Sequence, residues 1–203
     1  MAEITALFWD VGGVLLTNGW DKTSRREAAE RFGLDWEEFE DRHQDVVTAF
    51  ETGRLSLEEY LKRTVFYRFR PFSTDEFKKF MFAKSRPHPE ALGIVAELAS
   101  AGGYLLATLN NEPLELNLYR IQQFGLRKYF TAFFSSCFLG VNKPDEAIYR
   151  RALQITQRAP EECLFIDDRS LNLECARQCG MRTILYQSPA QLRHELREAG
   201  VAL

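Results

Sequence analysis

The sequence lacks the features that would place the protein in a membrane or on a nucleic acid. No run of about 18 apolar residues occurs, so no transmembrane helix is predicted. The first residues also lack the basic and apolar regions of a signal peptide. Basic side chains are not in excess, because 26 Lys and Arg stand against 29 Asp and Glu, for a net charge of −3. We therefore expect a cytoplasmic protein without nucleic-acid or membrane partners.

Cysteine is also scarce, and its spacing excludes the common metal-binding patterns. The four cysteines are Cys137, Cys163, Cys175 and Cys179, and no two of them form a CxxC pair. A structural zinc site requires close pairs of ligands, and a disulfide framework is typical of secreted chains. Reduced, buried thiols are the interpretation that this spacing favours.

The sequence does contain strand and helix patterns that alternate. Hydrophobic residues make up 45% of the 203 positions, which suits one domain or a domain with an insertion. Short apolar runs that predict buried strands occupy Ile4–Trp9, Tyr104–Leu109, Phe133–Phe138, Cys163–Ile166 and Thr183–Tyr186. Helical patterns follow at Pro89–Ala101, Pro113–Phe124, Asp145–Thr156, Leu171–Cys179 and Pro189–Ala199. This alternation predicts an α/β fold with a doubly wound parallel sheet, whose ligands bind at the carboxyl ends of the strands.

Residues 18–87 interrupt the alternation. Apolar residues recur there at helical spacing over Arg25–Phe32, Trp36–Phe50, Leu57–Arg68 and Thr74–Ala83, without a strand between them. Ser56 with Glu59 has the spacing of a capping box, and Thr74 with Phe77 gives a weaker start signal. The pattern predicts a core formed by residues 1–17 and 88–203, with a helical insertion at 18–87.

Four polar clusters follow the predicted strands: Asp10, Asn110-Asn111, Lys143 and Asp167-Asp168. Taken singly, such residues are commonly turn formers, helix caps or surface lysines. Adjacent carboxylates such as Asp167-Asp168 raise each other's pKa unless a cation offsets them. Because each cluster follows its own strand, their joint occurrence predicts a site that combines carboxylates with one lysine.

This order of motifs resembles the haloacid dehalogenase-like hydrolases along essentially the whole chain. The segment Asp10-Val11-Gly12-Gly13-Val14-Leu15 matches the first motif of that family, and Lys143-Pro144 matches the third. Asn110-Asn111 matches the second motif, for which Thr108 is a competing assignment. Asp168 with Asn172 matches the fourth, and residues 18–87 look like the small helical cap of the family.

The resemblance implies a Mg²⁺-dependent hydrolase, with phosphatase activity on a small phosphorylated molecule as the first expectation. Asp10 would be the nucleophile and would bind the metal together with the carbonyl of Gly12 and with Asp168. Lys143 would neutralise the charge of nucleophile and phosphoryl group. The remaining motif residues divide into those that would contact the phosphoryl group (Asn110, Asn111 and Thr108) and those that would orient the site (Asp167 and Asn172). Monomer and homodimer both remain open.

Two departures from the family pattern leave alternatives open. Gly12 stands where the family's phosphatases carry an acid, and Asn110 stands where they carry Ser or Thr. Without an acid at position 12, the rate should rise steeply as the pKa of the leaving group falls. His43 is the first candidate for another proton donor, and Asn18, Trp20 and Arg54 are further ones. A metal-free 2-haloacid dehalogenase and a non-catalytic binding protein are the alternative functions.

Overall fold

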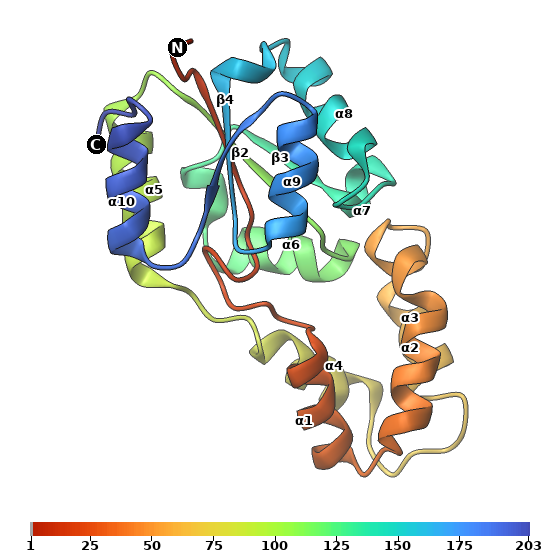
Figure 1. Ribbon diagram of the computed structural model, residues 1–203. Coiled ribbons are helices and arrows are strands. Elements are labelled where there is room, and N and C mark those ends of the chain that lie inside the picture. Colours follow the sequence, from red (N-terminus) through yellow and green to blue (C-terminus); the bar gives the residue numbers. More distant parts are fainter. Residues whose placement is uncertain (1) are drawn as a thin grey trace.

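Five parallel strands form the centre of the fold. The computed structural model describes residues 2–203. The strands are β1 (Ala6–Trp9), β2 (Leu105–Asn110), β3 (Ala132–Ser135), β4 (Cys163–Asp167) and β5 (Arg182–Leu185). They are hydrogen-bonded in the order β3-β2-β1-β4-β5, so the chain reverses its direction of winding between β1 and β4 (Figure 1). The predicted α/β fold with a doubly wound parallel sheet is confirmed.

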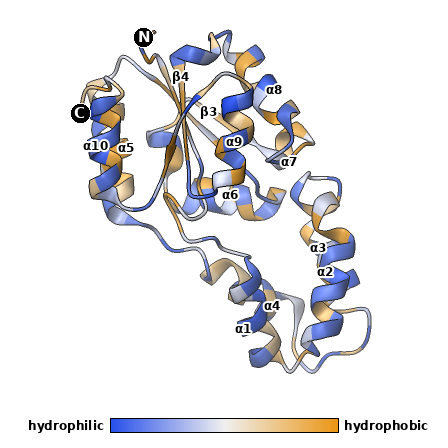
Figure 2. Ribbon diagram, viewed as in Figure 1, coloured by the Kyte–Doolittle hydropathy of each residue, from blue (hydrophilic) through white to orange (hydrophobic). Residues whose placement is uncertain are grey.

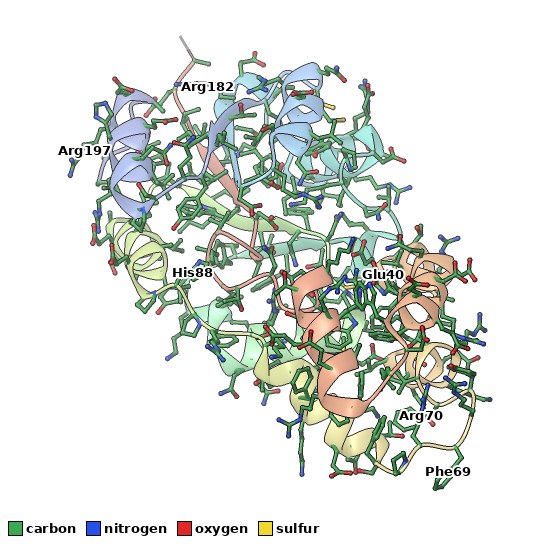
Figure 3. All side chains as sticks on the ribbon, turned by 60° about the horizontal axis from the view of Figure 1, so that its bottom comes forward. Glu40, Phe69, Arg70, His88, Arg182 and Arg197 are labelled. Atoms are coloured by element: carbon green, nitrogen blue, oxygen red, sulfur yellow. The ribbon has the colours of Figure 1, made fainter. Side chains whose placement is uncertain are left out.

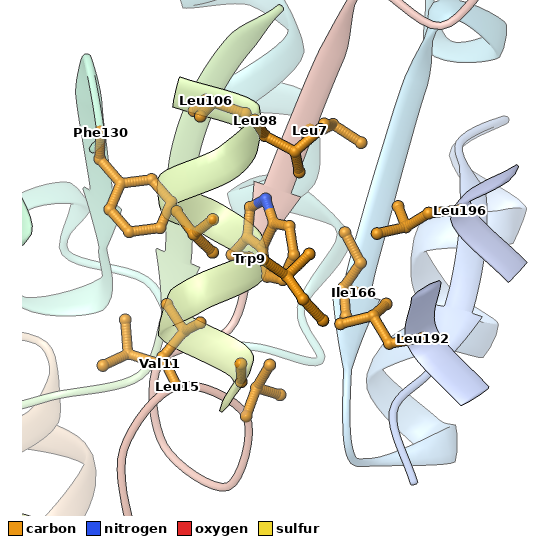
Figure 4. Packing of buried hydrophobic residues seen from close by; sticks show 14 of the residues in the cluster. Leu7, Trp9, Val11, Leu15, Leu98, Leu106, Phe130, Ile166, Leu192 and Leu196 are labelled. Carbon is orange, nitrogen blue, oxygen red and sulfur yellow. The ribbon is translucent and has the colours of Figure 1, made fainter. Parts of the chain in front are cut away.

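Helices cover both faces of this sheet. They are α5 (Pro89–Ala101), α6 (Leu114–Gln123), α7 (Ser136–Leu139), α8 (Glu146–Thr156), α9 (Ser170–Gln178) and α10 (Pro189–Glu198), with short 3-10 turns at Leu126–Lys128 and Pro160–Glu162. Alternate residues of β1 point to opposite faces, as the period of a strand requires. Leu7 and Trp9 pack toward α5 and α10, where Figure 4 shows Trp9 among Leu98, Ile166 and Leu192.

The segment between β1 and α5 contains helices and no strand. These helices are α1 (Lys22–Phe32), α2 (Trp36–Glu51), α3 (Leu57–Thr64) and α4 (Thr74–Ala83). They lie to one side of the sheet (Figure 1) and enclose a hydrophobic cluster of their own, in which the rings of Trp20 and Phe77 are 5.8 Å apart. Hydrophilic and hydrophobic residues intermix along them (Figure 2). Figure 3 shows Phe69 and Arg70 at the end remote from the sheet.

Three boundaries differ from the sequence prediction. The strand predicted for Phe133–Phe138 ends at Ser135, and α7 begins at Ser136. The helix predicted for Leu57–Arg68 ends at Thr64. Helix α4 is capped by Ser73, whose side chain and that of Glu76 form a reciprocal capping box, and not by Thr74. Apolar spacing continues through these positions, so periodicity alone could not locate the ends.

The helical segment is joined to the sheet by two adjacent stretches of chain. The N–H of Thr17 donates to the carbonyl of Arg86 at 2.9 Å, and Leu16 forms an isolated bridge with Pro87. Further contacts tie α2 and α3 to the other part: Ser136 Oγ donates to the carbonyl of Glu51 at 2.6 Å, and the N–H of Leu57 donates to Glu115. Among residues 2–203, no helix has the length and apolar character of a bilayer span.

Candidate active site

Asp10 and Asp167 stand side by side because of the register of two strands. Trp9 of β1 is paired with Ile166 of β4, and the N–H of Asp10 donates to the Ile166 carbonyl at 2.9 Å. The next residue of each strand is therefore level with the other at the carboxyl edge of the sheet. This is also where the direction of winding reverses, and such switch points are where open α/β sheets bind ligands.

Lys143 bridges these two carboxylates. It lies between α7 and α8, and its Nζ is 3.0 Å from Asp10 Oδ1 and 2.6 Å from Asp167 Oδ2. Burial alone would lower the pKa of Lys143, but the two carboxylates together raise it above its usual value. Burial raises the pKa of Asp10 to about 7, against the effect of Lys143. The lysine is thus a fixed cation beside a carboxylate that burial would otherwise neutralise.

The backbone of Lys143 is held by Asn111. The side-chain amide of Asn111 donates to the Lys143 carbonyl and accepts from the Lys143 N–H, both at 2.8 Å. Two hydrogen bonds in opposite directions fix the loop that carries the lysine. The side chain predicted to contact a phosphoryl group is therefore engaged in positioning Lys143.

Asp168 points toward the first motif and has a free acceptor. Its Oδ1 is buried without a hydrogen-bond partner among the described residues. Gly13 has φ +79°, and a Cβ at this position would collide with the Asp168 carboxylate, so only glycine allows the two segments to approach. Burial and the neighbouring Asp167 raise the pKa of Asp168. These observations indicate a carboxylate whose surroundings suit a bound cation.

The carboxylates of Asp10, Asp167 and Asp168 meet the requirements of a hard cation. One oxygen of each lies within 4.8 Å of the others, and carboxylate oxygens are the ligands that Mg²⁺ prefers. Both oxygens of Asp167 already accept hydrogen bonds, from Lys143 and Asn172. Asp10 and Asp168 line the neighbouring cavity and Asp167 does not. The donor set therefore fits a metal held by Asp10 and Asp168, with Asp167 and Asn172 behind them.

Asn110 and Thr108 do not reach the cavity. The amide of Asn110 donates to Asn117 at 3.3 Å and its oxygen accepts from Ser135 at 2.9 Å, so it is bound between β3 and α6. Thr108 is fully buried in the middle of β2, and its hydroxyl has no partner among the described residues. A direct contact of these two side chains with substrate stays a prediction, and both lie outside the walls of this cavity.

A cavity of about 630 Å³ opens in front of the carboxylates. It lies between the edge of the sheet and helices α1 and α2, and both parts of the chain contribute to its walls. Its lining residues are Asp10, Gly12, Asn18, Trp20, Asp21, Lys22, Arg25, His43, Gln44, Val47, Phe50, Glu51, Asn111, Glu112, Pro113, Asn142, Lys143, Asp168, Arg169 and Asn172. Of the four alternative proton donors, Arg54 alone is missing from these walls.

Sequence reasoning missed several charged groups in these walls, among them Arg25, Glu51 and Glu112. Arg25 is buried and forms a two-pronged ion pair with Glu40, each contact being 2.9 Å. Burial raises the pKa of both Glu51 and Glu112. A signal was available for Glu112, because it follows the Asn110-Asn111 motif directly. For Arg25 and Glu51, helical spacing in the insertion gave no indication of the face that meets the cavity.

His43 is part of a hydrogen-bonded chain, and its burial keeps it neutral. Trp20 Nε1 donates to the hydroxyl of Tyr60 at 2.9 Å, and this hydroxyl lies 2.9 Å from His43 Nδ1. Since indole N–H can only donate, the Tyr60 proton is free to go to Nδ1, which leaves the His43 proton on Nε2. Burial, with Arg25 nearby, lowers the pKa of His43 to about 4. At neutral pH the imidazolium form is absent, and the neutral ring is too weak an acid to protonate a leaving group.

The neutral state of His43 makes an acid-sensitive contribution to stability. Because its pKa is about 4 in the folded protein and 6.5 in the unfolded chain, only the unfolded chain gains a proton between these values. The His43 contribution is therefore fully present above pH 6.5 and falls as the pH drops toward 4. The raised pKa values of Asp10 and Glu112 act in the opposite direction, so we expect the His43 loss of about 2 kcal/mol between pH 7 and pH 5 as a difference between the native protein and a His43 variant in urea unfolding.

His43→Gln is the variant that checks this assignment. It should be less stable than the native protein at pH 7 but should lose less stability on acidification. His194→Gln is the matched control, because His194 is exposed on α10. Equal acid sensitivity of the His43 variant and the native protein would assign the effect to another group.

The fold and site define a doubly wound α/β protein with a buried aspartate, a bridging lysine and an acidic pair at its switch point. Comparison with known proteins gives the family. The model for the haloacid dehalogenase-like hydrolases matches residues 4–180. The chain belongs to this family of hydrolases, and the resemblance inferred from its motifs is confirmed.

Individual relatives are similar over different parts of the chain. Flavin mononucleotide hydrolase 1 of Arabidopsis thaliana is 27% identical over 171 residues, which are 84% of this chain and 69% of that enzyme. Bifunctional epoxide hydrolase 2 of Rattus norvegicus is 37% identical over 129 residues, and the match spans 62% of this chain but only 23% of that protein. A haloacid dehalogenase family enzyme of Bacteroides thetaiotaomicron, solved as a magnesium complex, has a TM-score of 0.82 at 19% identity, covering 97% of this chain and 100% of the other.

Proposed function

We propose that the protein is a Mg²⁺-dependent phosphatase that hydrolyses a small phosphorylated metabolite through an aspartyl-phosphate on Asp10. One observation carries the proposal: Asp10 faces the cavity beside Lys143 and Asp168, with a buried carboxylate oxygen of Asp168 left without a partner. The relative from Arabidopsis thaliana is named as a hydrolase of a phosphate ester, and the structure from Bacteroides thetaiotaomicron is a magnesium complex. Both agree with this chemistry.

Asp10, Asp168 and the carbonyl of Gly12 would hold the Mg²⁺ ion. When bound, the ion supplies positive charge that offsets the developing charge of the transferring phosphoryl group. Its positive charge would also stabilise the ionised forms of Asp10 and Asp168, whose pKa values are raised. Asp167 keeps its place behind the ligands, since Lys143 and Asn172 hold both of its oxygens.

The protein's own residues account for the first half of the reaction. Asp10 Oδ1 accepts the N–H of Val11 at 2.8 Å, which orients the carboxylate. Its other oxygen can attack phosphorus, forming the aspartyl-phosphate while the bond to the ester oxygen breaks. Lys143 remains close to both anions and lowers the cost of bringing them together. Water then releases phosphate from Asp10 in the second half.

We further propose that residues 18–87 act as a cap that selects the substrate, on a core formed by residues 1–17 and 88–203. Trp20, His43, Val47 and Phe50 contribute a wall opposite the carboxylates. A cavity of about 630 Å³ suits a metabolite rather than a polymer. Because the cap supplies this wall, its side chains would contact the part of the substrate that distinguishes one phosphate ester from another.

Phosphate release from a panel of phosphate esters, with and without Mg²⁺, tests the proposal. We expect release that requires Mg²⁺ and stops when the ion is chelated. Chloride release from a 2-haloacid without metal would support the dehalogenase alternative. Ligand binding without release of phosphate or chloride would support the binding-protein alternative and contradict the proposal.

Asp168→Ala should remove Mg²⁺ binding without unfolding the protein. The lost carboxylate supplies one of two side-chain ligands, and its exposure to the cavity limits the packing defect. Isothermal calorimetry should show Mg²⁺ binding to the native protein and none to the variant. Asp75→Ala, at an exposed position of α4, is the control. Unchanged binding in Asp168→Ala would place the ion elsewhere.

A further inference from the structure

Two polar side chains lie close to Gly12, the position at which the family's phosphatases carry an acid. A Cβ added to Gly12 would lie 3.2 Å from Asn18 Oδ1 and 3.7 Å from Arg120 Nη1. No positive φ is required at Gly12, so the backbone itself would accept a side chain. A guanidinium is thus already present where a carboxylate at position 12 would extend.

That guanidinium is occupied by a different carboxylate. Arg120 Nη1 donates to Glu112 Oε2 at 2.6 Å, and both side chains are almost completely buried. These two distances place the Glu112 oxygen about 6 Å at most from the Cβ that an acid at position 12 would have. Glu112 and Gly12 both line the cavity. Glu112 therefore brings a carboxyl group to the region that the family's acid would occupy.

Arg120 fixes this group through contacts on its other nitrogens. Its Nε donates to Ser85 Oγ at 3.0 Å, and its Nη2 donates to the carbonyl of Thr17. The N–H of Glu112 donates to Ser136 Oγ at 2.9 Å. Only Oε2 of the Glu112 carboxyl is engaged by protein among the described residues, which leaves Oε1 for a group bound in the cavity.

The charges around Glu112 suit proton transfer near neutral pH. Burial raises the pKa of Glu112 to about 7, Glu51 acts in the same direction, and Arg120 and Lys143 oppose it. Both protonation states are accessible at this pH, as an acid that later acts as a base requires. His43 lacks the necessary proton, because its pKa is about 4.

We propose that Glu112, held by Arg120, transfers the proton to and from the reacting oxygens in place of an acid at Gly12. The inference rests on the proposed phosphatase function. As Asp10 bonds to phosphorus and the ester bond breaks, the leaving oxygen takes the proton of Glu112. The resulting carboxylate is paired with Arg120. It then removes a proton from the water that attacks the aspartyl-phosphate, and the carboxylic acid is restored.

Glu112→Gln tests this role, because the amide keeps an acceptor for Arg120 but cannot exchange the proton. In the presence of Mg²⁺, kcat for propyl phosphate should fall by about 10²–10⁴. The fall for 4-nitrophenyl phosphate should be less than about tenfold, because 4-nitrophenolate leaves without a proton. The native protein should hydrolyse both esters at similar rates. This expectation replaces the steep dependence of the rate on leaving-group pKa that glycine at position 12 predicts from sequence alone.

A second variant separates proton transfer from structure. Gly12→Asp in the Glu112→Gln protein should restore part of the propyl phosphate rate. Carbon-13 NMR of the magnesium-free protein gives a readout independent of turnover. Of the carboxyl signals that titrate near pH 7, the glutamate signal should disappear in Glu112→Gln while the aspartate signal of Asp10 remains. Urea midpoints of all variants control for stability.

Glu51 is the competing carboxyl in the cavity, with Oε2 bonded to Asn142 at 3.3 Å. The inference is overturned if Glu51→Gln, rather than Glu112→Gln, selectively loses the propyl phosphate rate. It is also overturned if Glu112→Gln slows both esters equally and Gly12→Asp restores nothing. No phosphate release by the native protein from either ester would end the proposed function and this inference together. Release by the native protein with no effect of Glu112→Gln would end the inference alone.

Discussion

Asp10→Asn should reduce turnover by roughly 10⁴-fold or more while the fold remains intact. An amide has the shape of the carboxylate but cannot serve as the nucleophile for phosphorus. The variant keeps an oxygen for the Val11 N–H, and Lys143 keeps its contact with Asp167. Steady-state phosphate release in Mg²⁺ measures the loss. Rapid quenching of the native enzyme should trap phosphate on Asp10, and the variant should trap none.

Asp167→Asn is the matched control for this prediction. It makes the same chemical change one strand away, on a carboxylate that bonds Lys143 and Asn172 but does not line the cavity. We expect a loss of about 10–100-fold, as for residues that orient ligands. The assignment of the nucleophile is wrong if Asp10→Asn retains near-native turnover, or if Asp167→Asn costs more than Asp10→Asn.

Lys143→Met should remove both activity and stability. Methionine has a similar length without charge, so Asp10 and Asp167 would remain buried with their shared cation gone. Removing one partner of a buried ion pair costs about 3–5 kcal/mol of unfolding free energy. Turnover should fall by about 10³-fold or more, because electrostatic stabilisation of the transferring group is lost with the lysine.

The pH dependence of Lys143→Met has a definite sign. Loss of the cation raises the pKa of Asp10 in the folded protein further above its value in the unfolded chain. A raised folded pKa means that the folded protein binds more protons, so stability falls as pH rises. Urea midpoints should therefore show a larger defect at pH 8 than at pH 5.5.

Arg150→Met is the control for Lys143→Met. Arg150 is an exposed cation on α8, paired with Glu146 one turn away, and such surface pairs contribute about 0–1 kcal/mol. Its unfolding free energy should change by less than about 0.5 kcal/mol. A Lys143→Met protein as stable as Arg150→Met at pH 8 would contradict the importance of the bridge.

The elements of the fold were largely predictable because their signals are local. An apolar run followed by polar residues located β1, β2 and β4 to within two residues. The same rule placed Asp10 and Asp167 at one edge, since parallel strands end together. It failed at Phe133–Phe138, where serine and cysteine fit a strand and a helix equally, and the short α7 begins at Ser136.

The direction of individual side chains was not predictable. Asn110 and Asn111 are adjacent and chemically identical, yet one bonds Asn117 and Ser135 while the other holds the backbone of Lys143. Their difference follows from the alternation of β2 and from which elements pack on each side. A sequence pattern shows which residues of a strand alternate between its two faces, but it does not show which elements pack against each face.

The sequence by itself determined the family, the α/β alternation and the presence of carboxylates and a lysine after the strands, because each signal is a short local motif. Only the tertiary structure decided which carboxyl group lies beside Gly12. Glu112 reaches that place through Arg120, a buried charge on the apolar face of α6 that also bonds Thr17 and Ser85. These three partners come from three separate segments, and together they fix the orientation of the guanidinium. No local pattern specifies such a contact, because its energy exists only when the segments have packed together.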